Sequence, residues 1–256
     1  QLCQAIAMTA SLLPMCPFVS FIEGADSKDL YGGWGVHLAM FCVKAAKKGL
    51  TGPVQVFEEI QSFKSIFTGD KGRDVKPGEH YYINDVSFKQ FPACSSTHPA
   101  ISVILDLQEQ KNINPEQIDF VRVYTYPFSY ELDKDVREKL NSSSARLSIS
   151  YTVAVVMIEG SLDPSAFFSD ALSNGQYQEM RKKIIVQKED AYGDGPFGIR
   201  GSKVEINMRD GSAIVGETEG TRWGKNPSNK QLEQKFNFLT SDVLNRDLQQ
   251  ELIILS

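Results

Sequence analysis

The chain has 256 residues, of which 41% are hydrophobic and 23% are charged, and its formal net charge at pH 7 is −5. These values are those of an ordinary globular protein with one or two domains, and the lack of basic blocks argues against nucleic acid as a partner. No apolar run approaches the roughly 20 residues that a membrane helix needs, so we expect no membrane partner.

The N-terminal part of the chain has the spacing of helices. Residues 2–13 place apolar side chains at helical intervals up to Pro14, and residues 35–48 are apolar almost all round, which is typical of a helix inside a helical core. Another short helix is expected over residues 51–67. We therefore assign residues 1–72 to a helical domain.

The rest of the chain mixes strand and helix patterns. Residues 73–222 are predicted to form a smaller α+β domain, and Ser228 is expected to cap a last helix within residues 223–256, which we assign back to the helical domain. The elements predicted in between are a helix from His98, a strand over residues 118–126, a helix over residues 128–140, a helix capped by Ser142–Ser144 and ending at Gly160, a short helix over residues 176–182, a strand over residues 184–187 and a hairpin over residues 204–218.

Cysteine and histidine usage points to no metal site. The four cysteines contain no C-x-x-C pair, which favours reduced thiols in a cytoplasmic protein over a disulfide framework. The three histidines are isolated in sequence, so no metal-ligand spacing occurs. Cys94 has the chemistry of a nucleophile, but no nucleophile signature surrounds it, and free cysteines are commonly buried packing residues.

The segment around His98 is the strongest candidate for a site. Thr97 is a good N-cap and Pro99 is tolerated in a first turn, so His98 is expected at the start of a helix, beside free backbone N–H groups where an anion would settle. The positive helix end disfavours imidazolium, so the ring is expected to be neutral near pH 7. Such a histidine suits chemistry on a carboxylate substrate. A capping histidine on a surface helix is the alternative.

Two further residues have open interpretations. Lys28 stands close to Gly32 and Gly33, and it is either an ordinary solvated lysine or a fixed cation on a loop that approaches a ligand closely. Tyr151, early in a mostly apolar helix, either fills the core or directs its hydroxyl into a cleft. The local sequence does not decide between these alternatives.

Five segments, taken together and in this order, resemble the MmgE/PrpD family, which includes 2-methylcitrate dehydratase, cis-aconitate decarboxylase and iminodisuccinate epimerase. The segments are KDLYGGW from Lys28, AAKKGLTGP from Ala45, FKQFPACSSTHPAI from Phe88, ARLSISY from Ala145, and the pair Val204-Glu205 with Asp210-Gly211. The resemblance implies an all-helical core domain plus a smaller α+β lid, with the site between them, usually in a homodimer.

The resemblance also implies a function. Members are cofactor-free lyases or epimerases that carry out acid–base chemistry on small polycarboxylates. Lys28 matches the family's active-site lysine, His98 matches the histidine of its Cys-x-x-x-His-like segment, and Tyr151 falls in its Ser-x-x-Tyr segment. We expect His98 to transfer the proton, Lys28 to bind the substrate carboxylate or enolate, and Tyr151 to orient or donate a proton.

The resemblance covers only the C-terminal portion of the family, and Tyr31 stands where many members have histidine. The chain also begins inside its first predicted helix. We therefore expect a split subunit that works with a complementary N-terminal chain or as a homo-oligomer, a truncated product, or an inactive homologue. A non-catalytic subunit that docks through its apolar helices is the alternative to an enzyme.

Overall fold

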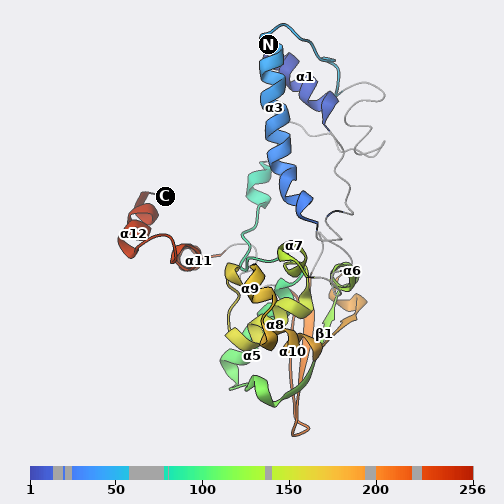
Figure 1. Cartoon of the computed structure of the whole chain (residues 1–256), viewed down its shortest axis with the longest axis vertical. Coiled ribbons are helices and arrows are strands. Elements are labelled where there is room, and N and C mark those ends of the chain that lie inside the picture. Colours follow the sequence, from blue (N-terminus) through green and yellow to red (C-terminus); the bar gives the residue numbers. More distant parts are fainter. Residues whose placement is uncertain are drawn as a thin grey trace. The chain divides into compact units, whose positions relative to one another are not determined.

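The computed structural model describes residues 1–13, 20, 25–57, 78–79, 81–135, 140–193, 200–220 and 227–255. Its internal contacts divide the chain into two units, one within residues 1–86 and the other mainly of residues 87–256 (Figure 1). The chain is α+β, as predicted, with many helices and one mixed sheet. The predicted domain boundaries at residues 72/73 and 222/223 stay predictions.

In the described part of the first unit two helices lie side by side, α1 (Leu2–Leu12) and α3 (Tyr31–Lys47), with a short 3-10 helix, η1 (Asp26–Leu30), before α3 (Figure 1). Their small shared core consists of Ala5, Met8, Leu38, Cys42 and Ala46. No described helix of the chain has both the length and the apolar character needed to cross a membrane.

The apolar helix α3 is covered on one face only within the described part of the chain. Sequence analysis predicts that it is surrounded by a helical core, yet Trp34, Val36 and Phe41 expose 50%, 61% and 58% of their surface. The reason is that α1 is the long helix packed against it, and one helix covers only one stripe of its neighbour. The helix predicted over residues 51–67 is a turn at residues 54–57, and its remainder lies outside the described residues.

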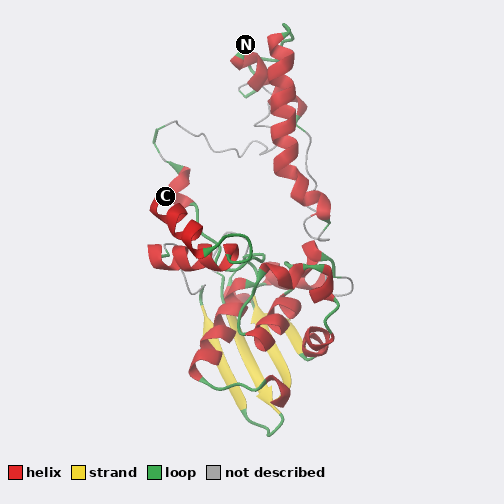
Figure 2. Ribbon diagram, turned by 60° about the vertical axis from the view of Figure 1, so that its left-hand side comes forward, coloured by secondary structure: helices red, strands yellow, loops and turns green. Residues whose placement is uncertain are grey.

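The second unit contains a four-stranded sheet with the order β2-β1-β3-β4 (Figure 2). Strand β1 pairs in parallel with β2 and antiparallel with β3, and β3 and β4 form an antiparallel hairpin. The predicted central strand and hairpin are confirmed. The strands are β1 (Ile118–Thr125), β2 (Ile184–Lys188), β3 (Ser202–Met208) and β4 (Ala213–Thr218).

Three helices supply the main core of the second unit. They are α5 (His98–Gln110), α8 (Ile149–Glu159) and α10 (Gly175–Lys182). Helix α5 contacts β3 and β4, whereas α8 contacts β2 and lies between α5 and α10. Since α8 is packed from several directions, every side chain from Ile149 to Met157 is buried, and its sequence is apolar almost throughout.

The helix expected after Ser142–Ser144 is in fact two helices. Asn141 caps the short α7 (Ser142–Ala145) in a capping box with Ser144, and Ser148 caps α8 separately. The prediction of one helix is wrong because two side chains that compete well at N-caps occur seven residues apart. The preceding helix α6 (Pro127–Asp135) agrees with the predicted start near residue 128, and residues 136–139 lie outside the described part.

Gly160 ends α8 with φ +67° and ψ 8°, in the left-handed region that favours glycine. We expect Gly160→Ala to lower the free energy of unfolding by about 1 kcal/mol, because alanine is strained there although space is open around the site. Urea unfolding of the two proteins measures this difference. An unchanged or higher midpoint at equal m-value would contradict it.

The C-terminal segment forms two helices where sequence analysis predicts one, α11 (Asn229–Thr240) and α12 (Arg246–Leu255). Ser228 caps α11 in a capping box with Gln231, as predicted for Ser228. Gln249 ties the two helices together by donating to the Asn237 carbonyl at 3.0 Å. The remaining short elements are η3 (Tyr82–Asp85), η4 (Pro115–Gln117), η5 (Pro164–Phe167), α9 (Ser169–Leu172) and η6 (Asp190–Tyr192).

Candidate active site

His98 is the first residue of α5, at the end of a tightly held loop. The Cys94 N–H donates to the Arg146 carbonyl at 2.8 Å, and the Ser129 hydroxyl donates to the Ser96 carbonyl at 2.9 Å. These bonds come from the α7–α8 connection and from α6, so two separate elements fix the loop. The imidazole lies edge-on to the Phe91 ring, with centroids 5.1 Å apart. The alternative of a surface histidine is wrong, because His98 is only 2% exposed.

The N-terminus of α5 receives no side-chain cap. Thr97 occupies the N-cap position, as predicted, but its hydroxyl donates to the Cys94 carbonyl at 2.9 Å instead of accepting from the helix. The predicted capping role is therefore wrong, since a nearer carbonyl takes the hydroxyl proton. The first turn of α5 also contains no acidic side chain. A positive helix end without a carboxylate retains its attraction for an anion.

The N-terminus of α8 is different. Asp133 is fully buried, and its Oδ1 accepts from the Ser150 N–H at 3.0 Å and from the Ser148 hydroxyl at 3.2 Å. The protein's own carboxylate thus occupies that helix end, as the helix dipole favours. The start of α5 has no acidic side chain in its first turn, but the N–H groups of Thr97 and His98 donate to the carbonyls of Cys94 and Ser95 at 3.0 and 3.4 Å. The prediction of free backbone N–H groups beside His98 is therefore wrong for these two residues.

The His98 imidazole is neutral at pH 7. Burial lowers its pKa to about 4, assisted by the ammonium of Lys89 and, more weakly, by that of Lys235, while the carbonyls of Ala93 and Phe91 oppose the change. Sequence analysis predicts the neutral ring, but it names the helix end as the cause, whereas burial is the largest contribution. His98 Nε2 is buried and has no hydrogen-bond partner among the described residues, and the same holds for Ser96 Oγ.

A buried nitrogen without a partner is costly in a purely structural role. Its presence on a neutral ring leaves a lone pair or a proton for a reacting group. This is the chemical feature that a general acid or base requires.

Lys28 lies in η1, in the first unit, and is half-buried. The neighbouring Gly32 and Gly33 are in the first turn of α3 and face open space, so the loop considered for Lys28 is helical. His98 and Tyr151 belong to the second unit. The predicted pairing of the Lys28 ammonium with the His98 imidazole stays a prediction.

Tyr151 is fully buried in α8. Its hydroxyl donates to the Ala166 carbonyl at 2.5 Å, and its ring lies 6.2 Å from Phe167 and 6.3 Å from Tyr177, centroid to centroid. Burial raises the pKa of the Tyr151 hydroxyl to about 12. These contacts fit the core-filling interpretation, and the orienting or proton-donating role stays a prediction.

The hydroxyl of Tyr151 provides a direct test of its structural role. We expect Tyr151→Phe to lower the free energy of unfolding by about 1–2 kcal/mol, because the buried Ala166 carbonyl loses its donor while the ring packing is kept. Urea unfolding at pH 7 gives the value, with Tyr130→Phe on α6 as a half-buried comparison. Equal stability of Tyr151→Phe and the unmodified chain would contradict the structural role.

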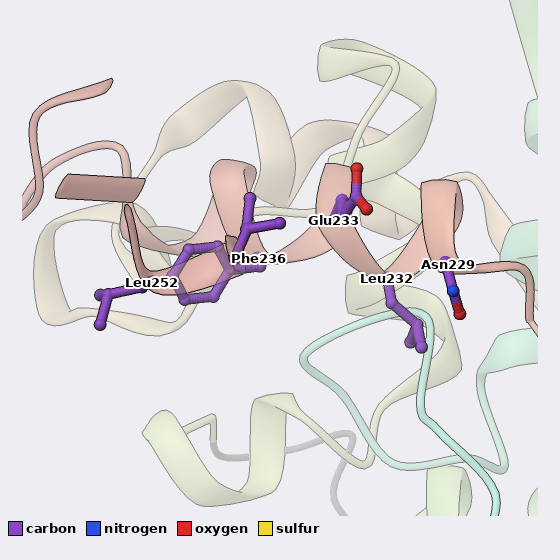
Figure 3. A pocket seen from close by; sticks show the side chains of 6 residues that line it. Asn229, Leu232, Glu233, Phe236 and Leu252 are labelled. Atoms are coloured by element: carbon purple, nitrogen blue, oxygen red, sulfur yellow. The ribbon is translucent and has the colours of Figure 1, made fainter. Parts of the chain in front are cut away.

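One pocket lies apart from these residues. It has a volume of about 420 Å³, is open to solvent and is lined by residues of α11 and α12, among them Phe236 and Leu252 (Figure 3). The residues that line it are Asn229, Leu232, Glu233, Phe236, Leu252 and Ile253. Its lining is mostly apolar and contains none of the three predicted site residues. Glu233 is its one ionisable lining residue, so the pocket does not bring together the set of groups predicted for the site.

The described cysteines are free thiols, and Cys94 is the one that lies in the His98 loop. Cys42 is buried in the first unit, Cys94 is partly buried, and these two and Cys3 are free thiols. Within the described residues, no three side chains of histidine, cysteine, aspartate or glutamate gather in a way that could hold a metal ion.

The His98 segment, the sheet and its covering helices lie within the part of the chain that matches a known family. The model of the MmgE/PrpD C-terminal domain matches residues 91–256, and the chain belongs to the MmgE/PrpD family. Cis-aconitate decarboxylase of Mus musculus is 24% identical over 242 residues, covering 89% of this chain and 48% of that protein. Cis-aconitate decarboxylase of Homo sapiens is 26% identical over 262 residues, covering 97% and 52%. The chain spans about half the length of these curated relatives.

Sequence analysis did not assign roles to the two lysines that act on His98. Lys89 was visible in the family-like segment FKQFPAC, where a cation nine residues before the histidine is a usable signal. Lys235 carried no such signal, because 137 residues separate it from His98 and only the fold brings α11 to the loop.

Proposed function

We propose that this chain supplies the His98 half of an MmgE/PrpD-type lyase that acts on a small polycarboxylate by acid–base chemistry at the carbon next to a carboxylate. The observation that carries the proposal is the buried, neutral imidazole of His98, whose Nε2 has no described partner, at the uncapped N-terminus of α5. The relatives support the reaction class, since both are named as decarboxylases of a tricarboxylic acid.

The chemistry follows from the charge on the reacting species. Dehydration removes a proton next to a carboxylate, and decarboxylation adds one after loss of CO₂, so either reaction needs a proton carrier beside a developing enolate. A pKa of about 4 would make His98 a weak base. A polycarboxylate substrate brings negative charge next to the ring, which raises that pKa toward neutrality. His98 thus gains basicity when its substrate is bound.

Lys28 and Tyr151 complete the proposed set. The ammonium of Lys28 would neutralise a substrate carboxylate or the enolate, which is the kind of charge stabilisation that often contributes most to catalysis. Tyr151 would orient the substrate or donate a proton, which requires its hydroxyl to leave the Ala166 carbonyl. No cofactor takes part in this scheme, and the reduced thiols favour the cytoplasm as the location.

Assembly is part of the proposal. Side chains around the uncovered side of α3 expose large apolar areas, among them Trp34, Met40 and Phe41. Together with coverage of about half of each relative, this surface supports a further helical part, contributed by a complementary N-terminal segment within a homodimeric enzyme.

The experiment compares the chain alone with the chain mixed with an N-terminal half of a family member. Each sample is incubated with cis-aconitate, 2-methylcitrate or iminodisuccinate, and products are followed by ¹H NMR. We expect turnover of one of these acids on mixing, and its loss when the chain carries His98→Gln. Absence of turnover with every acid in both samples would contradict the lyase proposal.

A second candidate is a non-catalytic subunit. The apolar face of α3 favours it, because a docking helix needs such a surface whether or not chemistry occurs. Size-exclusion chromatography separates the candidates when combined with the assay. A stable complex without turnover of any of the acids supports the docking subunit, and a complex with turnover supports the enzyme.

A further inference from the structure

We propose that Lys235 of α11 is a positioning residue of the His98 site, which ties the C-terminal helix to the histidine loop and places a second positive charge beside the imidazole. The proposal rests on the proposed function for its catalytic meaning. Its physical basis is a chain of contacts that runs from α11 to the imidazole.

The first contact joins two segments that are distant in sequence. The Lys235 ammonium donates a hydrogen bond to the backbone carbonyl of Lys89, 146 residues earlier in the chain. The Lys89 ammonium in turn donates to the Ala93 carbonyl at 3.2 Å. The Ala93 carbonyl and that of Phe91 are the backbone groups that face the imidazole of His98. Lys235 therefore holds the loop whose carbonyls orient the ring.

The second contribution is electrostatic. The ammonium groups of Lys235 and Lys89 both act on His98 in the direction that disfavours imidazolium, and among the described residues they are the charged groups that do so. The pKa of Lys235 is itself lowered by partial burial and by the nearby Lys89 ammonium. The two ammonium groups repel each other beside a neutral ring, and a bound carboxylate would reduce this repulsion.

A packing role and an electrostatic role of Lys235 predict different effects of its replacement on His98. A lysine that only packs α11 could be replaced by an uncharged side chain of similar length without any effect on His98. A lysine that acts through its charge must change the protonation of His98 whenever that charge is removed, since opposing and like charges within reach shift a pKa directly.

The test is a pH titration of the three histidines in the full chain by NMR, with the His98 signal assigned by its loss in His98→Gln. We expect Lys235→Met and Lys235→Gln each to raise the pKa of His98 by roughly half a unit, and Lys235→Arg to leave it unchanged. Lys235→Glu should raise it further. The matched control is Lys230→Met, which removes an exposed lysine from the same helix.

Equal pKa values of His98 in the unmodified chain, Lys235→Met and Lys235→Glu would overturn the proposal. If Lys235→Met does not fold, Lys235→Gln is the second variant, and a pKa of His98 equal to that of the unmodified chain in Lys235→Gln overturns the proposal as well. None of these measurements uses turnover. A shifted His98 pKa with no lyase activity therefore refutes the proposed function while it retains the role of Lys235.

Discussion

Replacing His98 with glutamine should reduce kcat of the assembled enzyme by about 10²–10⁴-fold, the range that a positioned general acid or base contributes. Glutamine has a similar size and keeps hydrogen-bonding groups, so the contact with Phe91 and the loop bonds at Cys94 and Ser96 should survive. The expected signature is a fall in kcat and kcat/KM together, because the lost interaction belongs to the transition state.

The control for this variant is Lys230→Met, which removes an exposed lysine near the start of α11. Its kcat should remain within a few-fold of the unmodified enzyme. A His98→Gln enzyme with unchanged kcat would remove His98 from the chemistry, whereas equal losses in both variants would indicate a general defect in assembly.

The second large effect concerns the pH dependence of stability. The pKa of His98 is about 4 in the folded chain against an ordinary value of 6.5, so between these values the unfolded chain binds a proton that the folded chain does not. Stability therefore rises with pH across this window. The contribution of His98 is fully present above pH 7 and falls by about 3 kcal/mol as the pH drops to 4, since each pKa unit corresponds to about 1.4 kcal/mol.

Urea unfolding at pH 7.5, 6.5, 5.5 and 4.5 measures this dependence. Carboxylates also titrate at the acid end, so the quantity to compare is the difference between the unmodified chain and His98→Gln at each pH. The free energy of unfolding of the unmodified chain minus that of His98→Gln should fall steadily as the pH falls. A constant difference over the whole range would mean that the folded and unfolded states share the same histidine pKa.

Much of the second unit could be predicted from local patterns. The alternating residues of β3, the β-branched run of β1 and the Arg209–Gly211 turn each encode their structure within a few residues. The helix that starts at His98 could also be predicted locally. Proline in the first turn and the apolar pair Ile101 and Ile104 at helical spacing are signals within a few residues.

The failures have a common physical origin in choices that local sequence leaves open. The Thr97 hydroxyl can donate a hydrogen bond or accept one from the helix, and in the structure it donates to the Cys94 carbonyl. The apolar sequence of α3 does not encode how much partner surface covers it. Tyr151 could face the core or a cleft, and the Ala166 carbonyl 15 residues away was the deciding partner.

For His98, too, local sequence predicts one property and misses another. Its position at a helix start could be predicted, but the cause of its neutrality could not, because burial and the charge of Lys235 come from elements far along the chain. The resemblance to the family proposes Lys28, His98 and Tyr151 as one catalytic set. The structure places them in three different elements, η1, α5 and α8.

The central claim is that His98 moves a proton at the carbon next to a substrate carboxylate. The most direct measurement is exchange of that carbon-bound hydrogen with solvent D₂O, followed by ¹H NMR on the polycarboxylate that the assembled protein accepts. We predict steady exchange with the unmodified chain and at least a hundredfold slower exchange with His98→Gln. Exchange at the same rate in both proteins would contradict the account.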